Sequence, residues 1–298
     1  MIRSLKKVCN PGFLDYLLGG AWRRLTNRAD CPCCGAAVGG TIDRKLFHSL
    51  IECAGCGILH RYPTEQDGEM AKFYQLAYDE PGFASEMPDA TTLRELLATN
   101  FRGTPKDFSS QIAILKALGL QPGQRLLDFG CSWGYATYQF RQAGFAAEGF
   151  ELSRPRAAFG RQLGLEIATQ PPATGQLIDM VYSSHVLEHV PNPLATLRAM
   201  LQWVRPGGLV VAQTPNGSPE FRAADPKAFH RLWGRVHPFL LTGEFVIRNF
   251  PDLPCYVSCN DRPDSVQAWD RSSRRMAELS GSNLFIVLVK DADSAHQP

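Results

Sequence analysis

The stretch RLLDFGCSWGY, residues 125–135, decides the fold of this chain of 298 residues. Its apolar start is short and bounded, as a buried parallel strand is, and the residues from Tyr135 to Gln142 have the pattern of a helix. Glycines between the two elements allow a sharp turn and a close approach of the backbone to a ligand. Ser132 and Tyr135 stand where the dinucleotide fingerprint has its second and third glycines, so a pyrophosphate cradle is not expected. The turn is predicted to bind another ligand of the nucleotide type.

One acid and three small residues of this turn carry a family resemblance. Asp128, Gly130, Ser132 and Gly134 stand at alternate positions, and a second acid, Glu151, ends the next apolar segment. The pattern resembles motif I of the class I S-adenosylmethionine-dependent methyltransferases, although Ser132 stands where that family commonly has glycine. The resemblance implies that the loop holds the methionyl half of the cofactor and that Glu151 binds both ribose hydroxyls, as an acid about 20 residues on does in dinucleotide folds. The alternative is an ordinary strand, turn and helix without a ligand.

A second strand end is expected beside this turn. The run from Leu177 to Tyr182 has the pattern of a strand, and its carboxyl end lies at the edge where open α/β sheets bind ligands. The LEHV run at 187–190 resembles the corresponding motif of the same family, whose preceding strand end lies along the cofactor. The resemblance implies that S-adenosylmethionine contacts Asp128, Gly130, Cys131, Ser132, Gly134, Glu151, Leu152, Ser183, Ser184 and His185.

The remaining segments complete a doubly wound sheet. The expected elements are a turn at 205–208 and strands at 209–212, 255–259 and 284–289. Helices are expected at 93–100, 108–118 and 265–279, and a further amphipathic helix is expected to end at Asn249. The last two strands fit the antiparallel edge of the methyltransferase family. We therefore expect an α/β fold, with a doubly wound Rossmann-like seven-stranded methyltransferase sheet and a small N-terminal zinc ribbon.

Two Cys-x-x-Cys pairs form the second informative pattern, with residues 35–52 between them. Each pair can place two thiolates on one tight turn, and the glycine after each supplies the unusual backbone angles of such a knuckle. Four sulfurs would converge on one structural Zn²⁺, since a closed four-cysteine site leaves no open position for catalysis. A thioredoxin-like redox pair is the alternative, but it leaves the second pair unexplained. The predicted ligands are Cys31, Cys34, Cys53 and Cys56, with Cys33 as a bystander and a hairpin at 41–50 over the metal.

Composition limits the class of protein. Apolar residues make up 44% and charged residues 20%, as in a globular chain that can bury a core, and the net charge of +2 provides no global attraction to nucleic acid. No apolar run approaches the roughly 18 residues of a membrane span, so no integral membrane association is expected. Nine cysteines, partly in pairs, fit a reducing compartment with a metal site, and the protein is expected in the cytoplasm.

Four segments are expected along the chain. They are a basic and apolar segment at 1–30, the zinc ribbon at 31–62, a connector at 63–105 and the S-adenosylmethionine-dependent methyltransferase domain at 106–298. For the first segment, a short helix packed on the body and a helix on a membrane surface are the two alternatives. The ribbon, an aromatic-Pro pair and the Phe73-Tyr74 pair resemble the zinc-binding front end of small-molecule and sugar methyltransferases.

The expected reaction is an in-line attack by a substrate oxygen, nitrogen or carbon on the sulfonium methyl of S-adenosylmethionine. The expected partner is a small-molecule substrate, such as a sugar nucleotide or a secondary-metabolite intermediate. RNA is the alternative acceptor, because some ribosomal RNA methyltransferases begin with four-cysteine zinc modules, but the nearly neutral ribbon argues against it. A non-catalytic scaffold is the third hypothesis, and the intact Asp128 and Glu151 argue against that one.

Three histidines are candidates for catalysis. His185 lies nearest the predicted pocket mouth, and His189 has hydrogen bonding within its own turn as its alternative role. His237 follows residues 217–234, an aromatic and basic segment predicted to form a substrate lid, in a position that resembles a histidine of many family members. A neutral imidazole can accept the proton of a hydroxyl acceptor at cellular pH. The alternative for His237 is a backbone hydrogen bond that only ties the lid to the sheet.

Overall fold

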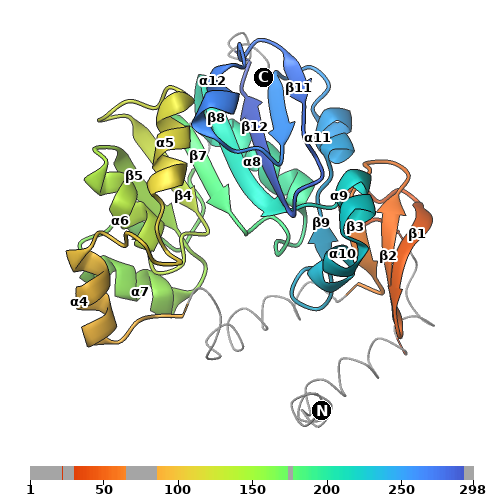
Figure 1. Cartoon of the computed structure of the whole chain (residues 1–298), viewed down its shortest axis with the longest axis horizontal. Coiled ribbons are helices and arrows are strands. Elements are labelled where there is room, and N and C mark those ends of the chain that lie inside the picture. The colour runs from red at the N-terminus through yellow and green to blue at the C-terminus, as the bar shows by residue number, and fades with distance from the viewer. Residues whose placement is uncertain (1–21, 23–29, 65–85, 174–176, 292–298) are drawn as a thin grey trace.

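The computed structural model describes residues 22, 30–64, 86–173 and 177–291. In these ranges, the main body is a sheet of eight strands in the order β11-β10-β12-β8-β7-β4-β5-β6 (Figure 1). Strands β6, β5, β4, β7 and β8 run parallel, whereas β12 is antiparallel to β8 and to β10. The expected α/β fold with an antiparallel edge is confirmed, and β11 adds an eighth strand. The strands are β4 (Arg125–Phe129), β5 (Ala146–Phe150), β6 (Ile167–Ala168), β7 (Ile178–Ser184), β8 (Val204–Pro215), β10 (Cys255–Ser258), β11 (Arg274–Met276) and β12 (Asn283–Val289).

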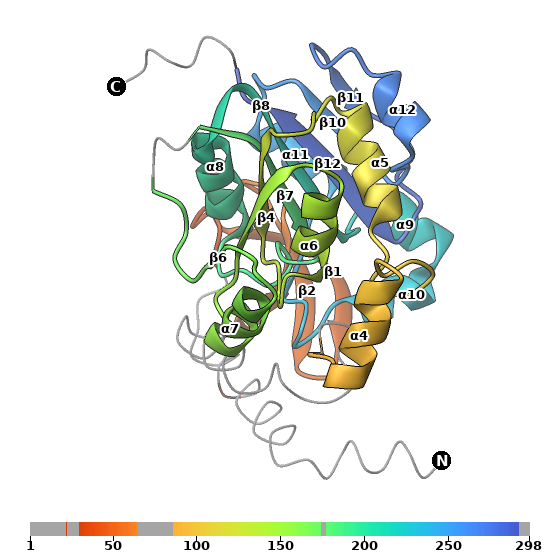
Figure 2. The ribbon, with the colours of Figure 1, turned by 90° about the vertical axis from the view of Figure 1, so that its left-hand side faces the viewer.

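The sequence of β4 explains why it lies inside the sheet. Successive side chains of a strand point to opposite faces, and Leu126 and Leu127 contribute to two different hydrophobic cores. Helices α5 and α6 cover the core that contains Leu126, and α8 and α11 cover the core that contains Leu127 (Figure 2). The helices around the sheet are α4 (Ala90–Ala98), α5 (Ser109–Ala117), α6 (Tyr135–Gln142), α7 (Arg154–Gln162), α8 (Pro193–Trp203) and α11 (Gly243–Asn249). The helices expected at 93–100, 108–118 and 135–142 are therefore present.

The cysteine-rich segment forms a small antiparallel sheet beside the main body (Figure 1). It contains β1 (Val38–Lys45), β2 (His48–Cys53) and β3 (Leu59–Tyr62), and the expected hairpin is the pair of β1 and β2. Its fourth strand, β9 (Phe239–Leu240), comes from a distant part of the chain and pairs with β3. Main-chain hydrogen bonds thus join the ribbon to the main body.

Residues 217–234 do not form the predicted lid. They form two short helices, and their large aromatic side chains are buried against strands of the ribbon. The prediction was wrong because nothing in the sequence shows that the ribbon presents an apolar face at this place, where burial of aromatic rings stabilises both partners. The helices are α9 (Pro219–Ala224) and α10 (Pro226–Leu232), and the shared core contains Leu50, Leu59, Phe221, Phe229, Trp233 and Leu240.

One further expectation was wrong. In place of a helix at 265–279, α12 (Pro263–Gln267) ends early and β11 follows it. The carboxylate of Asp270 accepts hydrogen bonds from the backbone N–H groups of Ser272 and Ser273, and such local bonds compete with a helix.

The turn expected at 205–208 lies within the bounds of β8. Gly207 has a φ angle of 71° there, and the pairing of β8 with β7 shifts register between Val204 and Leu209.

Some predictions concern residues outside the described ranges. They are the basic and apolar segment at 1–30, apart from Trp22 and Asp30, and the Phe73-Tyr74 part of the connector. Within the residues that the structure describes, no helix is both long enough and apolar enough to cross a membrane.

Gly160→Ala is expected to destabilise the fold. Helix α7 packs so closely on the turn after β4 that a Cβ atom here would lie 2.3 Å from Cδ1 of Ile167 and 2.8 Å from the carbonyl oxygen of Trp133. Because the backbone cannot simply move aside, we expect a loss of about 1–3 kcal/mol in the free energy of unfolding, measured in urea. Gly40→Ala is the control, since a Cβ atom there meets nothing within 4 Å. Equal losses in the two variants would contradict the prediction.

Candidate functional site

The turn after β4 has the backbone geometry of a tight ligand-binding loop. Gly130, Ser132 and Gly134 have φ angles of 78°, 54° and 86°, and Gly134 is the N-terminal cap of α6. A Cβ atom on Gly130 would lie 2.3 Å from a methyl group of Val186, so this position requires glycine. Ser132 adopts the left-handed region although it has a side chain, which is an unfavourable conformation that its surroundings must hold.

Two charged side chains hold Ser132 in this conformation. Its backbone N–H donates to Oε2 of Glu151 at 3.0 Å, and its hydroxyl oxygen accepts from Nη1 of Arg156 at 2.7 Å. Arg156 lies on α7 and is only 1% exposed. An arginine in a helical pattern normally faces solvent, so no signal in the sequence indicated this role.

Glu151 lies where the second acid of the motif is expected. Its Oε1 accepts from the backbone N–H of Ser153 at 2.7 Å, while Oε2 accepts from Ser132. Burial raises the pKa of Glu151, and the two N–H donors and Arg156 oppose that rise. Each carboxylate oxygen retains a further lone pair, so the group is able to accept from two ribose hydroxyls. The neighbouring Leu152 is 61% exposed and offers an apolar surface to a ligand.

Asp128, near the end of β4, is a buried acid that connects this strand to helix α6. It is 3% exposed, and its Oδ2 accepts a hydrogen bond of 2.7 Å from the hydroxyl of Thr137 on α6. Burial raises the pKa of Asp128 to about 7. The hydrogen bond therefore fastens the end of β4 to the first turns of the helix that follows.

Parallel pairing brings the other predicted cofactor contacts to the same edge. Strand β4 pairs with β5 and with β7, so Gly130, Glu151 and Ser184 lie at three neighbouring strand ends. Cys131 is buried in the turn, and Ser183 is buried with a hydroxyl that has no hydrogen-bond partner among the described residues. The arrangement of these residues fits an adenosyl-type cofactor, because glycine turns, an acid and strand ends meet in one place.

The three candidate histidines gather around one buried carboxylate, that of Glu188. Nδ1 of His185 lies 3.3 Å from its Oε1, Nε2 of His189 lies 3.7 Å from the same oxygen, and the hydroxyl of Thr214 donates to Oε2 at 3.1 Å. The rings of His189 and His237 are 4.9 Å apart between centroids. Glu188 was not among the residues predicted from the sequence, although its place in the LEHV run, between His185 and His189, could have identified it.

Backbone contacts determine the tautomers of two of these rings. Nδ1 of His189 lies 2.7 Å from the carbonyl oxygen of Val236, and Nδ1 of His237 lies 2.7 Å from that of Leu232. A carbonyl oxygen only accepts, so we assign the proton of each neutral ring to Nδ1 and the lone pair to Nε2. Glu188, His189 and His237 each offer one ligand atom, and the three atoms lie within 4.8 Å of one another. Such a group of acceptors is able to hold a proton or a divalent cation.

The charges of this cluster are coupled. The hydrogen bond to Glu188 raises the pKa of His185 above its ordinary value. Burial lowers the pKa of His189, against the attraction of Glu188. Burial also opposes the ionisation of Glu188, but the hydrogen bond from His185 and the charges of both histidines outweigh it, so the pKa of this carboxyl is lowered. The cluster therefore combines a carboxyl that ionises more readily with one histidine of raised pKa and one of lowered pKa.

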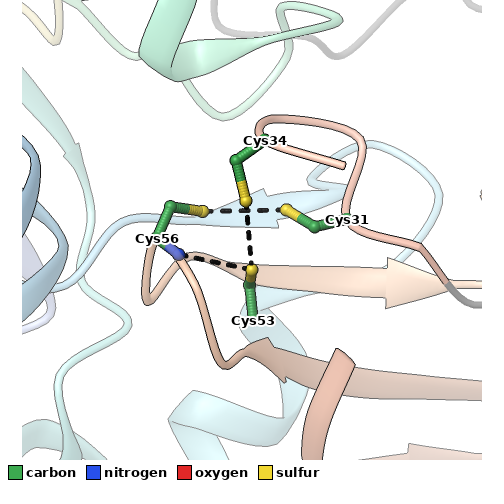
Figure 3. A group of neighbouring side chains, drawn as sticks. All are labelled: Cys31, Cys34, Cys53 and Cys56. Carbon is green, nitrogen blue, oxygen red and sulfur yellow. Dashed lines mark hydrogen bonds between the residues drawn. The ribbon is translucent and has the colours of Figure 1, made fainter. Parts of the chain in front are cut away.

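The four predicted zinc ligands converge in the ribbon (Figure 3). Their sulfur atoms lie within 4.8 Å of one another, with Cys31 and Cys56 separated by 3.7 Å and Cys34 and Cys53 by 3.5 Å. A tetrahedral site with Zn–S bonds of about 2.3 Å requires sulfurs about 3.8 Å apart, so the thiols fit Zn²⁺. The glycines that follow the two pairs, Gly35 and Gly57, have φ angles of 71° and 76°, as expected for the knuckles.

Comparison with known proteins identifies the family. Residues 59–251, more than half of the chain, match the family model described as a methyltransferase domain. The chain belongs to this methyltransferase family. The methyltransferase family expected from motif I is thereby confirmed, together with its α/β fold.

Similar proteins cover only parts of this methyltransferase or are distant in sequence. The ubiquinone biosynthesis O-methyltransferase of Bordetella avium (strain 197N) is 33% identical over 118 residues, which are 36% of this chain and 49% of the relative. The protein of the same name from Nitrosococcus oceani is 28% identical over 166 residues, which are 51% of this chain and 63% of the relative. The chain thus spans about half the length of the curated relatives it matches. A solved structure of the plantazolicin methyltransferase BpumL in complex with SAH matches with a TM-score of 0.48 and 12% identity, over 75% of this chain and 98% of that one.

We expect the ribbon to bind one zinc ion. Metal analysis of protein purified without chelator should find about one zinc per chain, and the Cys53→Ser, Cys56→Ser double variant should lose it because two sulfurs do not close a tetrahedral site. Cys33→Ser is the control and should keep its zinc, since Cys33 is not one of the four converging thiols. A zinc-free wild-type protein, or a fully loaded double variant, would overturn the assignment.

Glu151→Ala should weaken cofactor binding. The change leaves two ribose hydroxyls without their acceptor, which costs on the order of 1–3 kcal/mol for a charge-assisted hydrogen bond. Isothermal titration with SAH measures the effect, and Glu148→Ala in β5, three residues before Glu151, is the control because its carboxylate pairs with Arg125 instead. Unchanged affinity in a folded Glu151→Ala protein would refute the role.

Proposed function

We propose that this methyltransferase transfers a methyl group from S-adenosylmethionine to a small-molecule acceptor. The observation that carries the proposal is the buried carboxylate of Glu188, with three histidines around it, directly beyond the strand end that lies beside the cofactor loop. A proton-accepting group suits an acceptor that loses a proton as it is methylated. The curated relatives are named O-methyltransferases, which supports a hydroxyl acceptor. The proposal also covers methylation of a nitrogen or a carbon atom. The substrate that carries the methylated atom would be a sugar nucleotide or a secondary-metabolite intermediate.

The cofactor half of the proposed site consists of the motif I turn, Glu151 and the end of β7. When bound, S-adenosylmethionine supplies the electrophilic methyl group on its sulfonium. The chain itself supplies alignment, because the rigid loop and the carboxylate of Glu151 orient the cofactor for in-line attack. The residues that would hold it are Asp128, Gly130, Cys131, Ser132, Gly134, Glu151, Leu152, Ser183, Ser184 and His185.

His185 is the residue best placed to accept the proton. Its side chain is 50% exposed, and its Nδ1 is occupied by Glu188, so Nε2 is the atom left for an acceptor. The hydrogen bond to Glu188 raises the pKa of His185, which makes the neutral ring a stronger base. Glu188 also orients the ring and stabilises the imidazolium that forms, as the carboxylate of a catalytic triad does.

His189 and His237 would complete the cluster as positioning groups. Each fixes its ring with one hydrogen bond from Nδ1 to a backbone carbonyl. For His237 this is the alternative role named from the sequence, whereas for His189 the partner, Val236, lies outside the turn in which that bond was expected. Their remaining nitrogens lie beside Glu188 and are able to share a proton that arrives at His185. Since one nitrogen of His237 lies in this cluster, His237 would be the base if it accepts the proton of the substrate in place of His185.

A cofactor titration followed by an acceptor screen tests the proposed function. Isothermal titration should detect binding of S-adenosylmethionine and SAH, and labelled cofactor should then transfer its methyl group to a component of a metabolite pool. Transfer to total RNA and not to small molecules would replace the proposal with an RNA methyltransferase. Failure to bind the cofactor would leave a scaffold that only keeps the fold.

Substitution of the histidines should separate the base from its neighbours. His185→Gln keeps a hydrogen-bonding side chain but not its basicity, so turnover should fall by roughly 10²–10⁴, whereas SAH affinity, to which His185 also contributes, should fall far less. His237→Gln is the matched comparison and should lose less. Near-normal turnover in His185→Gln with a loss of that size in His237→Gln would make His237 the base.

The pH dependence of turnover should report on Glu188. Because only the neutral imidazole accepts a proton, the activity of the wild-type protein should rise with pH through the raised pKa of His185. Glu188→Gln removes the carboxylate that raises this pKa, so the midpoint of the rise should move to lower pH. A midpoint that stays in place in a folded Glu188→Gln protein would contradict the coupling of the two residues.

A further inference from the structure

The segment that carries His237 is held from outside by the zinc ribbon. We call residues 230–240 the His237 segment. At its end, β9 pairs with β3 through Leu240 opposite Leu59 and Phe239 opposite His60, and the backbone N–H of Arg61 donates to the carbonyl of Pro238 at 2.8 Å. A strand of two residues has little stability of its own, so its position depends on β3 and, one residue further on, on the hydrogen bond of 2.7 Å from the backbone N–H of Gly217 to the carbonyl of Leu241.

Side chains of the ribbon also hold the segment. Arg61 is 1% exposed, and its Nη1 donates to the carbonyl of Gly234 at 3.0 Å. Lys45 donates to the carbonyl of Trp233 and lies 4.4 Å from the centroid of the indole ring. Asp43 accepts from Nε1 of Trp233 at 2.8 Å and lies 2.7 Å from Nδ1 of His230. Three side chains of β1 and β3 thus fix the outer side of the loop.

The inner side of the same loop contacts the histidine cluster. The carbonyl of Val236 accepts from Nδ1 of His189, and the ring of His237 lies against that of His189. A shift of the loop would therefore move one histidine directly and release the hydrogen bond that fixes the tautomer of the other. The His237 segment therefore contacts the ribbon on one side and the histidines beside Glu188 on the other.

The second cysteine knuckle is the turn that joins β2 to β3, and the two strands then pair from Glu52 opposite Leu59 to Ser49 opposite Tyr62. Cys53 is the last residue of β2. Its backbone N–H donates to the carbonyl of Ile58 at 2.9 Å, and the backbone N–H of Gly57 donates to the carbonyl of Cys53 at 2.9 Å. Leu59 follows as the first residue of β3. A metal ion on Cys53 and Cys56 closes this turn, whereas four free thiols do not constrain it, because metal binding in small modules is coupled to folding.

We propose that the zinc ribbon is a positioning element for the acceptor half of the active site: with its metal bound, it holds the His237 segment against His189 and Glu188. This inference rests on the proposed role of the histidine cluster. The cofactor half is held differently, since the motif I turn and Glu151 are fixed by β5, α6 and α7. Loss of the metal therefore loosens the acceptor half and leaves cofactor binding in place.

Arg61→Met and Asp43→Ala test the link without touching a cysteine, and Arg248→Met is the matched control. Arg248 also contacts the ribbon, through the carbonyls of Ala54 and Gly55, but it comes from α11 and not from the His237 segment. All three proteins are compared with the wild type before and after removal of zinc with a chelator. Zinc content, SAH affinity by titration, and hydrogen exchange of residues 230–240 are measured on each.

We expect amide exchange in residues 230–240 to become faster by roughly tenfold or more in zinc-free protein and in the Arg61 and Asp43 variants, as for a locally opened segment. Exchange at residues 125–151 and the Kd for SAH should change by no more than about twofold. The ¹⁵N shift of the His189 ring should move as its bond to Val236 is lost, and kcat should fall with the cofactor KM unchanged for any acceptor from the screen.

Four results would overturn the inference. They are a wild-type protein that carries no zinc, unchanged exchange of residues 230–240 after zinc removal, equal effects of Arg248→Met, and a loss of SAH affinity that parallels the loosening. A chain that binds no SAH even with zinc present would instead refute the proposed function, so the two failures are distinguishable.

Discussion

The parallel pairing of β4 with β5 on one side and β7 on the other is the constraint on which the site depends. Carboxyl ends of parallel strands meet at one edge, so the motif I turn, Glu151 and His185 arrive together although they are distant in the chain. The strand order also reverses between β4 and β7, and such a switch point opens a crevice between the loops on either side. Strand order alone therefore places the cofactor half of the site.

The buried carboxylate of Glu188 organises the other half. Such a group is costly to bury unless donors surround it, and here the hydroxyl of Thr214 donates to one oxygen and Nδ1 of His185 lies 3.3 Å from the other. The same contacts that stabilise the charge also orient the rings and shift the pKa of His185 upward and that of His189 downward. Groups whose environments move their pKa values apart are suited to different roles in proton transfer, which supports the proposed division of the cluster into a base and its supporting groups.

The ribbon and the main body form one structure. A module of about thirty residues buries too little apolar surface to be stable alone, and here it gains a fourth strand from β9 and a shared core with α9 and α10. The side-chain amide of Asn192 at the start of α8 donates to the carbonyl of Cys33 at 3.1 Å, which ties the first knuckle to the body as well. The sequence predicts a domain boundary at residue 62, and strand pairing and a shared core connect the residues before that boundary to the main body.

The sequence by itself determined the local chemistry of this protein. The strand, turn and helix of residues 125–142, the left-handed glycines and the cysteine knuckles follow from short-range sterics and spacing, and the family resemblance extended them to the order of the strands. Only the tertiary structure decided which distant groups meet. It brought His185, His189 and His237 to Glu188, took Ser132 to Arg156, and buried Phe221 and Trp233 against the ribbon instead of leaving them in a lid. Burial and hydrogen bonding depend on partners far along the chain, and no local pattern encodes where those partners will lie.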